Sequence, residues 1–132
     1  MVVQEKVGEY SALDLAFMGD AVFEAMVREM VLSKGSLPVN KAALEAKKYV
    51  KASAQAAMFH NIYDLLTEDE QSVIKRGRNA KTFSRAKNAS VSDYRHATGL
   101  ETLFGYLYLA GRRERDREIF KLCVEGANNG EI

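Results

Sequence analysis

The sequence lacks the features that mark secreted or membrane-bound chains. It has one cysteine, one proline and no tryptophan in 132 residues. A lone cysteine, Cys123, excludes an internal disulfide, and no further cysteine stands at zinc-ligand spacing from it. No apolar run is long enough to cross a bilayer, and no charged-then-apolar leader opens the chain. We therefore expect a cytoplasmic protein that makes no contact with a membrane.

The sequence also lacks a surplus of charge of either sign. The formal net charge is +1, so any affinity for nucleic acid must come from local clusters of basic residues. Gly/Ser-rich linkers and internal repeats are absent as well. Hydrophobic residues make up 47% of the chain, which is enough for one core in a domain of this length. We expect a single domain over residues 1–132.

The hydrophobic pattern is helical throughout and predicts a compact all-α domain of about six helices. Predicted N-caps are Ser11, Asn40, Ser53, Thr67 and Ser92, and Thr67 with Glu70 has the spacing of a capping box. The first helix, about 12–33, is apolar on nearly every side, so we expect neighbours to cover it. Residues 77–90 lack apolar periodicity and predict a loop, and a last helix is expected over about 114–127.

Two carboxylates interrupt the most apolar part of the first helix. Asp20 and Glu24 are four residues apart in "FMGDAVFEAMV" and share one face. Asp20 follows Gly19, and both residue types weaken a helix interior. Glu101 repeats the anomaly in "GLETLFGYLYL".

Two interpretations of these acids remain open at this point. A helix ladder explains Glu24 through Arg28, four residues on, and Arg28 or Arg112 could neutralise a buried acid. Alternatively, carboxylates from two helices converge on a divalent cation. Mg²⁺ suits oxygen ligands and keeps waters, which leaves room for a phosphate group.

A basic segment lies between these two acidic helices. From Gln71 to Ser92 the chain has no acidic residue, although its total charge is nearly balanced. A solvated loop is one interpretation, and a surface that binds the phosphate backbone of nucleic acid is the one we favour. The basic residues of this segment are Lys75, Arg76, Arg78, Lys81, Arg85 and Lys87, and Arg95 follows it.

Two motifs in the right order resemble the ribonuclease III family. "LDLAFMGDAVFE" resembles the family's signature helix, and "LETLFGYLYLAG" resembles its second catalytic helix. The similarity extends over nearly the whole chain and is closest to the short Mini-III branch, which has the catalytic domain alone. Leu13, Ala16 and Thr98 stand where the family usually has acids, a depletion typical of that branch.

The resemblance implies a homodimeric, Mg²⁺-dependent endonuclease that cuts double-stranded RNA into 5′-phosphate and 3′-hydroxyl ends. It implies that Asp20 and Glu101 are catalytic metal ligands, and that Phe17 packs against the partner subunit. It also implies a role in maturation of 23S ribosomal RNA. The position of Glu24 is compatible with a supporting role behind the ligands, and His96 is either an RNA contact or a surface histidine. The alternative function is a non-catalytic RNA-binding or ribosome-associated protein of the same fold.

Overall fold

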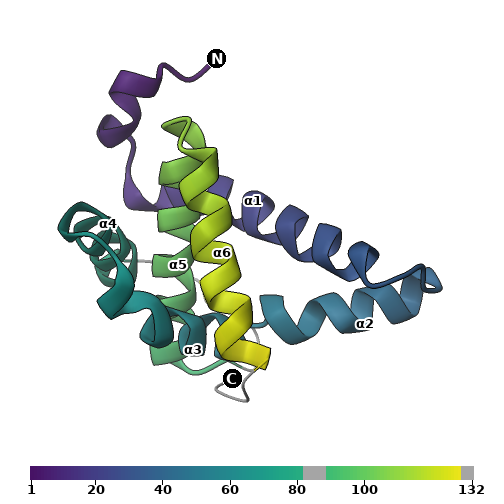
Figure 1. Ribbon diagram of the computed structural model, residues 1–132. Helices are drawn as coiled ribbons and strands as arrows, with labels where there is room; N and C mark the ends of the chain where they lie inside the picture. The colour runs from purple at the N-terminus through teal and green to yellow at the C-terminus, as the bar shows by residue number, and fades with distance from the viewer. Residues whose placement is uncertain (82–88, 129–132) are drawn as a thin grey trace.

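The computed structural model describes residues 1–81 and 89–128 and is all-helical over those residues, as the sequence predicted. Six α-helices and two short 3-10 helices follow one another along the chain (Figure 1). Their bounds are η1 Gln4–Glu9, α1 Ala12–Ser33, α2 Val39–Val50, α3 Ala52–Ile62, η2 Tyr63–Leu65, α4 Glu68–Asn79, α5 Val91–Leu109 and α6 Arg113–Asn128. Among the described residues, no helix is long and apolar enough to span a bilayer.

Helix α5 is the centre of the fold, and α1, α3, α4 and α6 all pack against it (Figure 1). Its buried side chains include Leu100, Leu103, Phe104 and Leu107, each 0% exposed. The Phe104 ring packs edge-on against Phe23 of α1, with ring centres 5.3 Å apart. The glycines and small residues of α5 let several helices approach it closely at once.

The closest approach is the crossing of α1 and α5, which two glycines make possible. A Cβ atom on Gly19 would lie 1.6 Å from the carbonyl oxygen of Glu101. A Cβ atom on Gly105 would lie 1.9 Å from the carbonyl oxygen of Leu15. No side chain fits at either point, because real Cβ contacts are never that short. The crossing thus explains why glycine stands in the interior of both helices, where it lowers helix stability.

The start of α1 and the start of α4 confirm the predicted caps. Ser11 Oγ accepts a hydrogen bond from the Asp14 N–H at 3.0 Å. Thr67 and Glu70 form the reciprocal capping box, with side-chain-to-backbone distances of 2.9 and 3.2 Å. Both caps depend only on contacts within one turn of helix, so the local sequence is enough to predict them.

Other predicted boundaries are wrong by one to three residues. The N-caps of α2, α3 and α5 are Pro38, Lys51 and Ser90, in place of the predicted Asn40, Ser53 and Ser92. Helix α4 continues to Asn79, so the predicted loop over 77–90 loses its first three positions. Gly77 is helical because it packs on α5, where a Cβ atom would meet Thr102 Oγ1 at 2.2 Å. The tertiary contact therefore outweighs the weak helix propensity of glycine.

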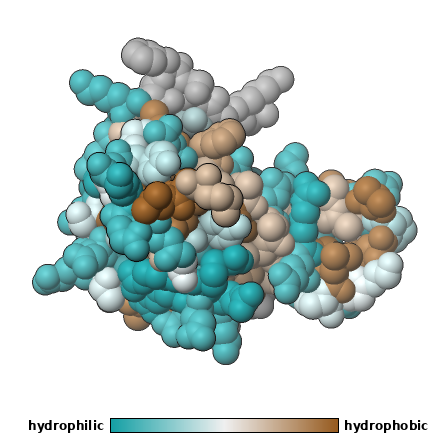
Figure 2. Space-filling model, turned by 90° about the horizontal axis from the view of Figure 1, so that it is seen from above, coloured by the Kyte–Doolittle hydropathy of each residue, from teal (hydrophilic) through white to brown (hydrophobic). Residues whose placement is uncertain are grey.

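Helix α1 is less covered than its apolar sequence predicted. Phe17 is 84% exposed and Leu13 is 40% exposed on the same side of its first turns. At its other end α1 forms an arm with α2 that projects from the body (Figure 1). Figure 2 shows hydrophobic side chains on this arm as well as on the body. The exposed hydrophobic residues at the end of the arm are Leu32, Leu37, Val39 and Leu44.

A buried ion pair ties α6 to α4. The Glu70 side chain is 0% exposed, and Arg115 donates to its two oxygens, both at 2.8 Å. These hydrogen bonds hold the pKa of Glu70 below its usual range. Arg112 also approaches Glu70, at 3.8 Å. From the sequence, Arg112 was a candidate partner for a buried acid such as Glu101. In the structure, Arg112 lies beside Glu70 instead.

We predict that Gly19→Ala destabilises the protein, because its methyl group would collide with the backbone of α5. The expected loss is about 3 kcal/mol or more in the free energy of unfolding, measured by urea denaturation. Gly8→Ala is the matched control, since nothing lies within 4 Å of a Cβ atom there. A Gly19→Ala protein as stable as the Gly8→Ala control would contradict the close crossing.

Candidate active site

The α1–α5 crossing brings together the two acids that the sequence singled out. Asp20 follows Gly19 on α1, and Glu101 supplies the carbonyl against which Gly19 packs. The two side chains are close enough for the charge of Asp20 to raise the pKa of Glu101. The predicted convergence of residues 20 and 101 is therefore present in the fold.

Among residues 1–81 and 89–128, no arginine forms an ion pair with either acid, which was the competing interpretation. Arg28 pairs with Glu24 at 3.2 Å, and Arg112 lies beside Glu70. The Glu24–Arg28 pair is the predicted helix ladder, so Glu24 has an ordinary structural role on an exposed face. Its negative charge still acts on Glu101, whose pKa it helps to raise.

Burial and the nearby acids raise the pKa of Glu101 to about 8. Burial has the largest effect, and the charge of Asp20 follows. Glu101 therefore holds a proton at neutral pH while no cation is present. A carboxyl group kept in this state is poised to exchange its proton for a metal ion.

Gln55 of α3 completes the site, and the sequence analysis missed it. Its side chain is only 2% exposed and lies beside Glu101. The Gln55 amide opposes the other effects by lowering the pKa of Glu101. No local pattern in the sequence distinguishes Gln55 from a solvated helix residue, because α3 meets α5 only in the folded chain.

The family's other usual acidic positions contribute no ligand here. Leu13 is partly exposed, Ala16 is buried, and Thr98 is 8% exposed. The Thr98 hydroxyl donates to the carbonyl oxygen of Tyr94 at 2.9 Å, so it is already satisfied. The acidic part of the site is thus the pair Asp20 and Glu101, with Glu24 behind it.

The donor set fits a hard divalent cation such as Mg²⁺. Asp20 and Glu101 offer carboxylate oxygens, the ligands that Mg²⁺ prefers. Cys123, the one soft ligand, is 0% exposed in the core, and burial raises the pKa of its thiol. Among residues 1–81 and 89–128, no three or more His, Cys, Asp or Glu side chains could hold one ion together. Two carboxylates are enough for Mg²⁺ when waters and a substrate phosphate fill its other positions.

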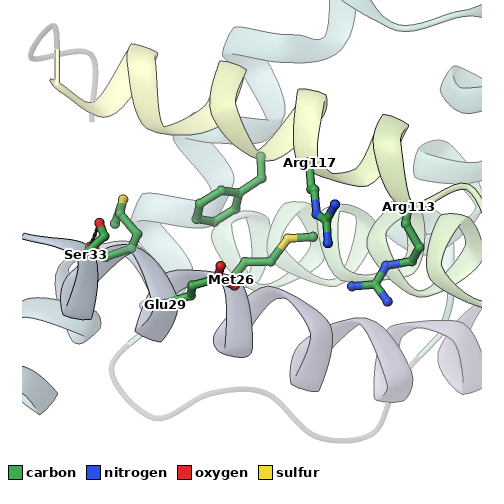
Figure 3. A pocket seen from close by; sticks show the side chains of 7 residues that line it. Met26, Glu29, Ser33, Arg113 and Arg117 are labelled. Carbon is green, nitrogen blue, oxygen red and sulfur yellow. Dashed lines mark hydrogen bonds between the residues drawn. The ribbon is translucent and has the colours of Figure 1, made fainter.

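A groove elsewhere on the molecule does not take part in this site. It has a volume of about 300 Å³ and lies between α1 and α6, where Arg113 and Arg117 reach from α6 toward Glu29 of α1 (Figure 3). Met26, Met30, Ser33 and Phe120 complete its lining. None of the site residues lines it.

The predicted basic residues gather where α3, α4 and α5 meet. Arg78 lies over the Phe59 ring, 6.0 Å from its centre, and Lys75 lies 5.5 Å from the centre of the Tyr63 ring. Lys75, Arg76, Lys81 and Arg95 are exposed, and Arg76 donates to the carbonyl oxygen of Tyr10 at 3.2 Å. Arg85 and Lys87 lie outside the described residues.

His96 is half-buried in the same region and is held by its neighbours. Its Nδ1 atom lies 2.7 Å from the carbonyl oxygen of Ser92. Its ring packs against Phe59 and His60, with centres 4.7 and 4.5 Å away. These contacts give His96 a structural role that the sequence interpretation of a surface histidine understated.

Comparisons with known proteins point to one family. The sequence pattern of the Ribonuclease III domain matches residues 13–112. The chain is 46% identical over 125 residues to the Mini-ribonuclease 3 of Thermoanaerobacter sp. (strain X514), which covers 95% of this chain and 88% of that protein. It is 50% identical over 117 residues to the Mini-ribonuclease 3 of Brevibacillus brevis, covering 86% of this chain and 87% of that protein. Its fold is similar to the crystal structure of a Fusobacterium nucleatum protein, with a TM-score of 0.80 and 32% identity, over 92% of this chain and 98% of that one.

We predict that Glu101→Gln raises the thermal stability of the metal-free protein at pH 8. The pKa of Glu101 is about 8 in the fold and about 4.5 in the unfolded chain, so the wild type loses stability as pH rises through that window. Glutamine has no proton to lose and escapes this loss. The expected gain in melting temperature is about 5 °C, allowing for partial solvent screening.

The measurement is thermal melting followed by circular dichroism in EDTA, at pH 8 and at pH 5. The gain should shrink at pH 5, where the wild-type carboxyl group is protonated in the fold. Glu29→Gln, which alters an exposed acid on α1, should melt like the wild type at both pH values. A Glu101→Gln protein that is no more stable than the wild type at pH 8 would show that the carboxyl group is not strained.

Proposed function

Because the chain belongs to the ribonuclease III family, we propose that it cleaves double-stranded RNA with Mg²⁺ held by Asp20 and Glu101. Membership of the family makes the chain an endoribonuclease. The observation that carries the proposed site is the proximity of two carboxyl groups from α1 and α5, neither of which pairs with an arginine among the described residues. This arrangement costs stability in the metal-free protein, and a cation would relieve the repulsion.

The positions of Asp20 and Glu101 suit them to bind one metal ion together. Asp20 and Glu101 face one another across the crossing, so both can bind the same ion once Glu101 releases its proton. When bound, Mg²⁺ supplies charge stabilisation at the scissile phosphate and lowers the pKa of an attacking water. This mechanism needs no histidine or lysine as a general base. The products would be 5′-phosphate and 3′-hydroxyl ends, as the family resemblance implies.

The basic surface at the meeting of α3, α4 and α5 is our candidate for the grip on the duplex. Lys75, Lys81 and Arg95 are exposed there, and Arg78 is half-buried on Phe59. Double-stranded RNA is recognised mainly by shape and by phosphate contacts, which cations on a rigid surface can provide.

A homodimer would explain the exposed hydrophobic face of α1. Phe17 is 84% exposed, and Leu13 and Tyr10 beside it are 40% and 38% exposed. Phe17 precedes Gly19 and Asp20 by only a few residues, so an interface there would place two sites close together. Two sites in one dimer match the two strands of a duplex, each site cutting one strand.

The wider biological role follows from the resemblance to the Mini-III branch. We propose that the substrate is a precursor of 23S ribosomal RNA and that the protein acts in the cytoplasm. The alternative of a non-catalytic RNA-binding protein is disfavoured, since the acids that such relatives lose are retained here. Relatives of 46% and 50% identity are named ribonucleases.

We predict that Asp20→Asn lowers the rate of duplex RNA cleavage by about 100-fold or more, because it removes a charged ligand from the site. The assay follows a long labelled duplex on a denaturing gel, with Mg²⁺ or with EDTA. Glu29→Gln serves as the matched control and should cleave at the wild-type rate. Binding of the duplex in EDTA should survive in Asp20→Asn, because phosphate contacts lie elsewhere. Near wild-type cleavage by Asp20→Asn would remove Asp20 from the metal site.

We predict that Phe17→Asp converts a dimer into a monomer, because a charge cannot be buried at an apolar interface without a partner. Light scattering after size-exclusion chromatography would measure the mass of each protein. Leu65→Asp, at an exposed hydrophobic position on η2, should keep the mass of the dimer. A monomeric wild type, or a dimeric Phe17→Asp protein, would refute an interface at Phe17.

A further inference from the structure

The buried side-chain amide of Gln55 lacks a hydrogen-bond partner for its oxygen in the described part of the chain, and it lies beside a proposed metal ligand. Its side chain is 2% exposed and lies against Glu101, one of the proposed cation ligands. The amide can donate through its nitrogen, but Gln55 Oε1 has no hydrogen-bond partner among the described residues. The site thus contains a buried acceptor with no donor, immediately behind a carboxyl group.

Packing alone gives no reason for an amide at this position. A buried acceptor without a partner costs about 1–3 kcal/mol, which an apolar side chain of equal length would avoid. The positions around Gln55 on α3 are apolar, with Ala54, Ala56 and Met58 all buried. The interface between α3 and α5 is therefore built for hydrophobic contact, and Gln55 is its polar exception.

Gln55 also differs from the charged groups that surround Glu101. Asp20 and Glu24 both disfavour the charged form of Glu101, whereas the Gln55 amide beside it favours that form. Ligating carboxylates are commonly oriented by outer hydrogen bonds, which strengthen the metal site without touching the ion. A neutral amide can do this without adding charge to an already acidic pocket.

We propose that Gln55 is a positioning residue of the cation site. Its amide N–H holds the Glu101 carboxylate toward Asp20, and its buried Oε1 accepts a hydrogen bond from a water that enters with the cation. The proposal rests on the proposed function, because it needs Asp20 and Glu101 to be the ligands. It explains why a polar side chain stands in an apolar interface, and it gives the orphaned acceptor a partner in the loaded state.

The test is a titration of the purified protein with Mn²⁺, an oxygen-preferring substitute for Mg²⁺. The signal of free Mn²⁺ in electron paramagnetic resonance reports the bound fraction without any cleavage. Gln55→Met keeps the length of the side chain and removes both polar atoms. We expect its dissociation constant for Mn²⁺ to rise by about 10-fold or more, the usual effect of losing such a partner. Its melting temperature in EDTA should stay within a few degrees of the wild type.

Gln71→Met is the matched control. Gln71 is a half-buried glutamine whose amide donates to the carbonyl oxygen of Tyr63 at 2.9 Å, away from the carboxylates. Its replacement should leave the Mn²⁺ affinity unchanged. If Gln55→Met does not fold, Gln55→Asn retains the amide but is one methylene too short to reach Glu101, and the same loss of affinity is expected.

Asp20→Asn in the same titration separates the two proposals. If Asp20→Asn abolishes Mn²⁺ binding while folded Gln55→Met or Gln55→Asn binds within twofold of the wild type, Gln55 has no positioning role and the metal site stands. If Asp20→Asn binds Mn²⁺ like the wild type, the proposed site itself is wrong, and the role of Gln55 falls with it. Loss of affinity in both variants, with Gln71→Met unchanged, supports both proposals.

Discussion

The contact of α1 with α5 at Gly19 and Gly105 is the constraint on which the rest of the molecule depends. The backbones meet so closely that neither position has room for a Cβ atom. This approach sets the distance between Asp20 and Glu101, because each acid lies on or next to the contacting backbone. A crossing at ordinary helix separation, about 8–10 Å between axes, would hold the two side chains farther apart. The absence of a side chain at Gly19 and Gly105 therefore allows the two acids to lie close together.

The site shows the conflict between stability and function that is common where charges are held ready for a ligand. A carboxyl group on α1 lies close to one on α5, with a third acid nearby and a buried amide whose oxygen lacks a described partner. Each of these features lowers the stability of the protein without a cation. The fold offsets them with the apolar packing of α5 and with the Glu70–Arg115 pair, which ties α6 to α4. Arg28 and Arg112, the arginines considered as partners for these acids, lie beside Glu24 and Glu70 instead.

The hydrophobic face of α1 and the basic surface near Phe59 are built on helices that also contribute to the acidic site. Phe17 belongs to the same helix as Asp20, so one element carries both a candidate interface and half of the acidic pair. Helix α3 supplies Gln55 to the site and Phe59 to the basic surface. Since α1, α3 and α5 each serve two parts of the molecule, a shift of any of them would disturb the site and a binding surface together.

The amino-acid pattern correctly predicted the helical class and the caps at Ser11 and Thr67, and it singled out the two acids in apolar helices. These features depend on periodicity or on contacts within one turn, which are local. The starts of α2, α3 and α5 were misplaced because several polar residues near each start could serve as a cap. Packing between helices explains why Gly77 is helical and why Arg112 lies beside Glu70. It also explains why Phe17 is exposed and why Gln55 lies beside Glu101. Each of these depends on which helices meet, and that is set by packing between residues distant in the chain.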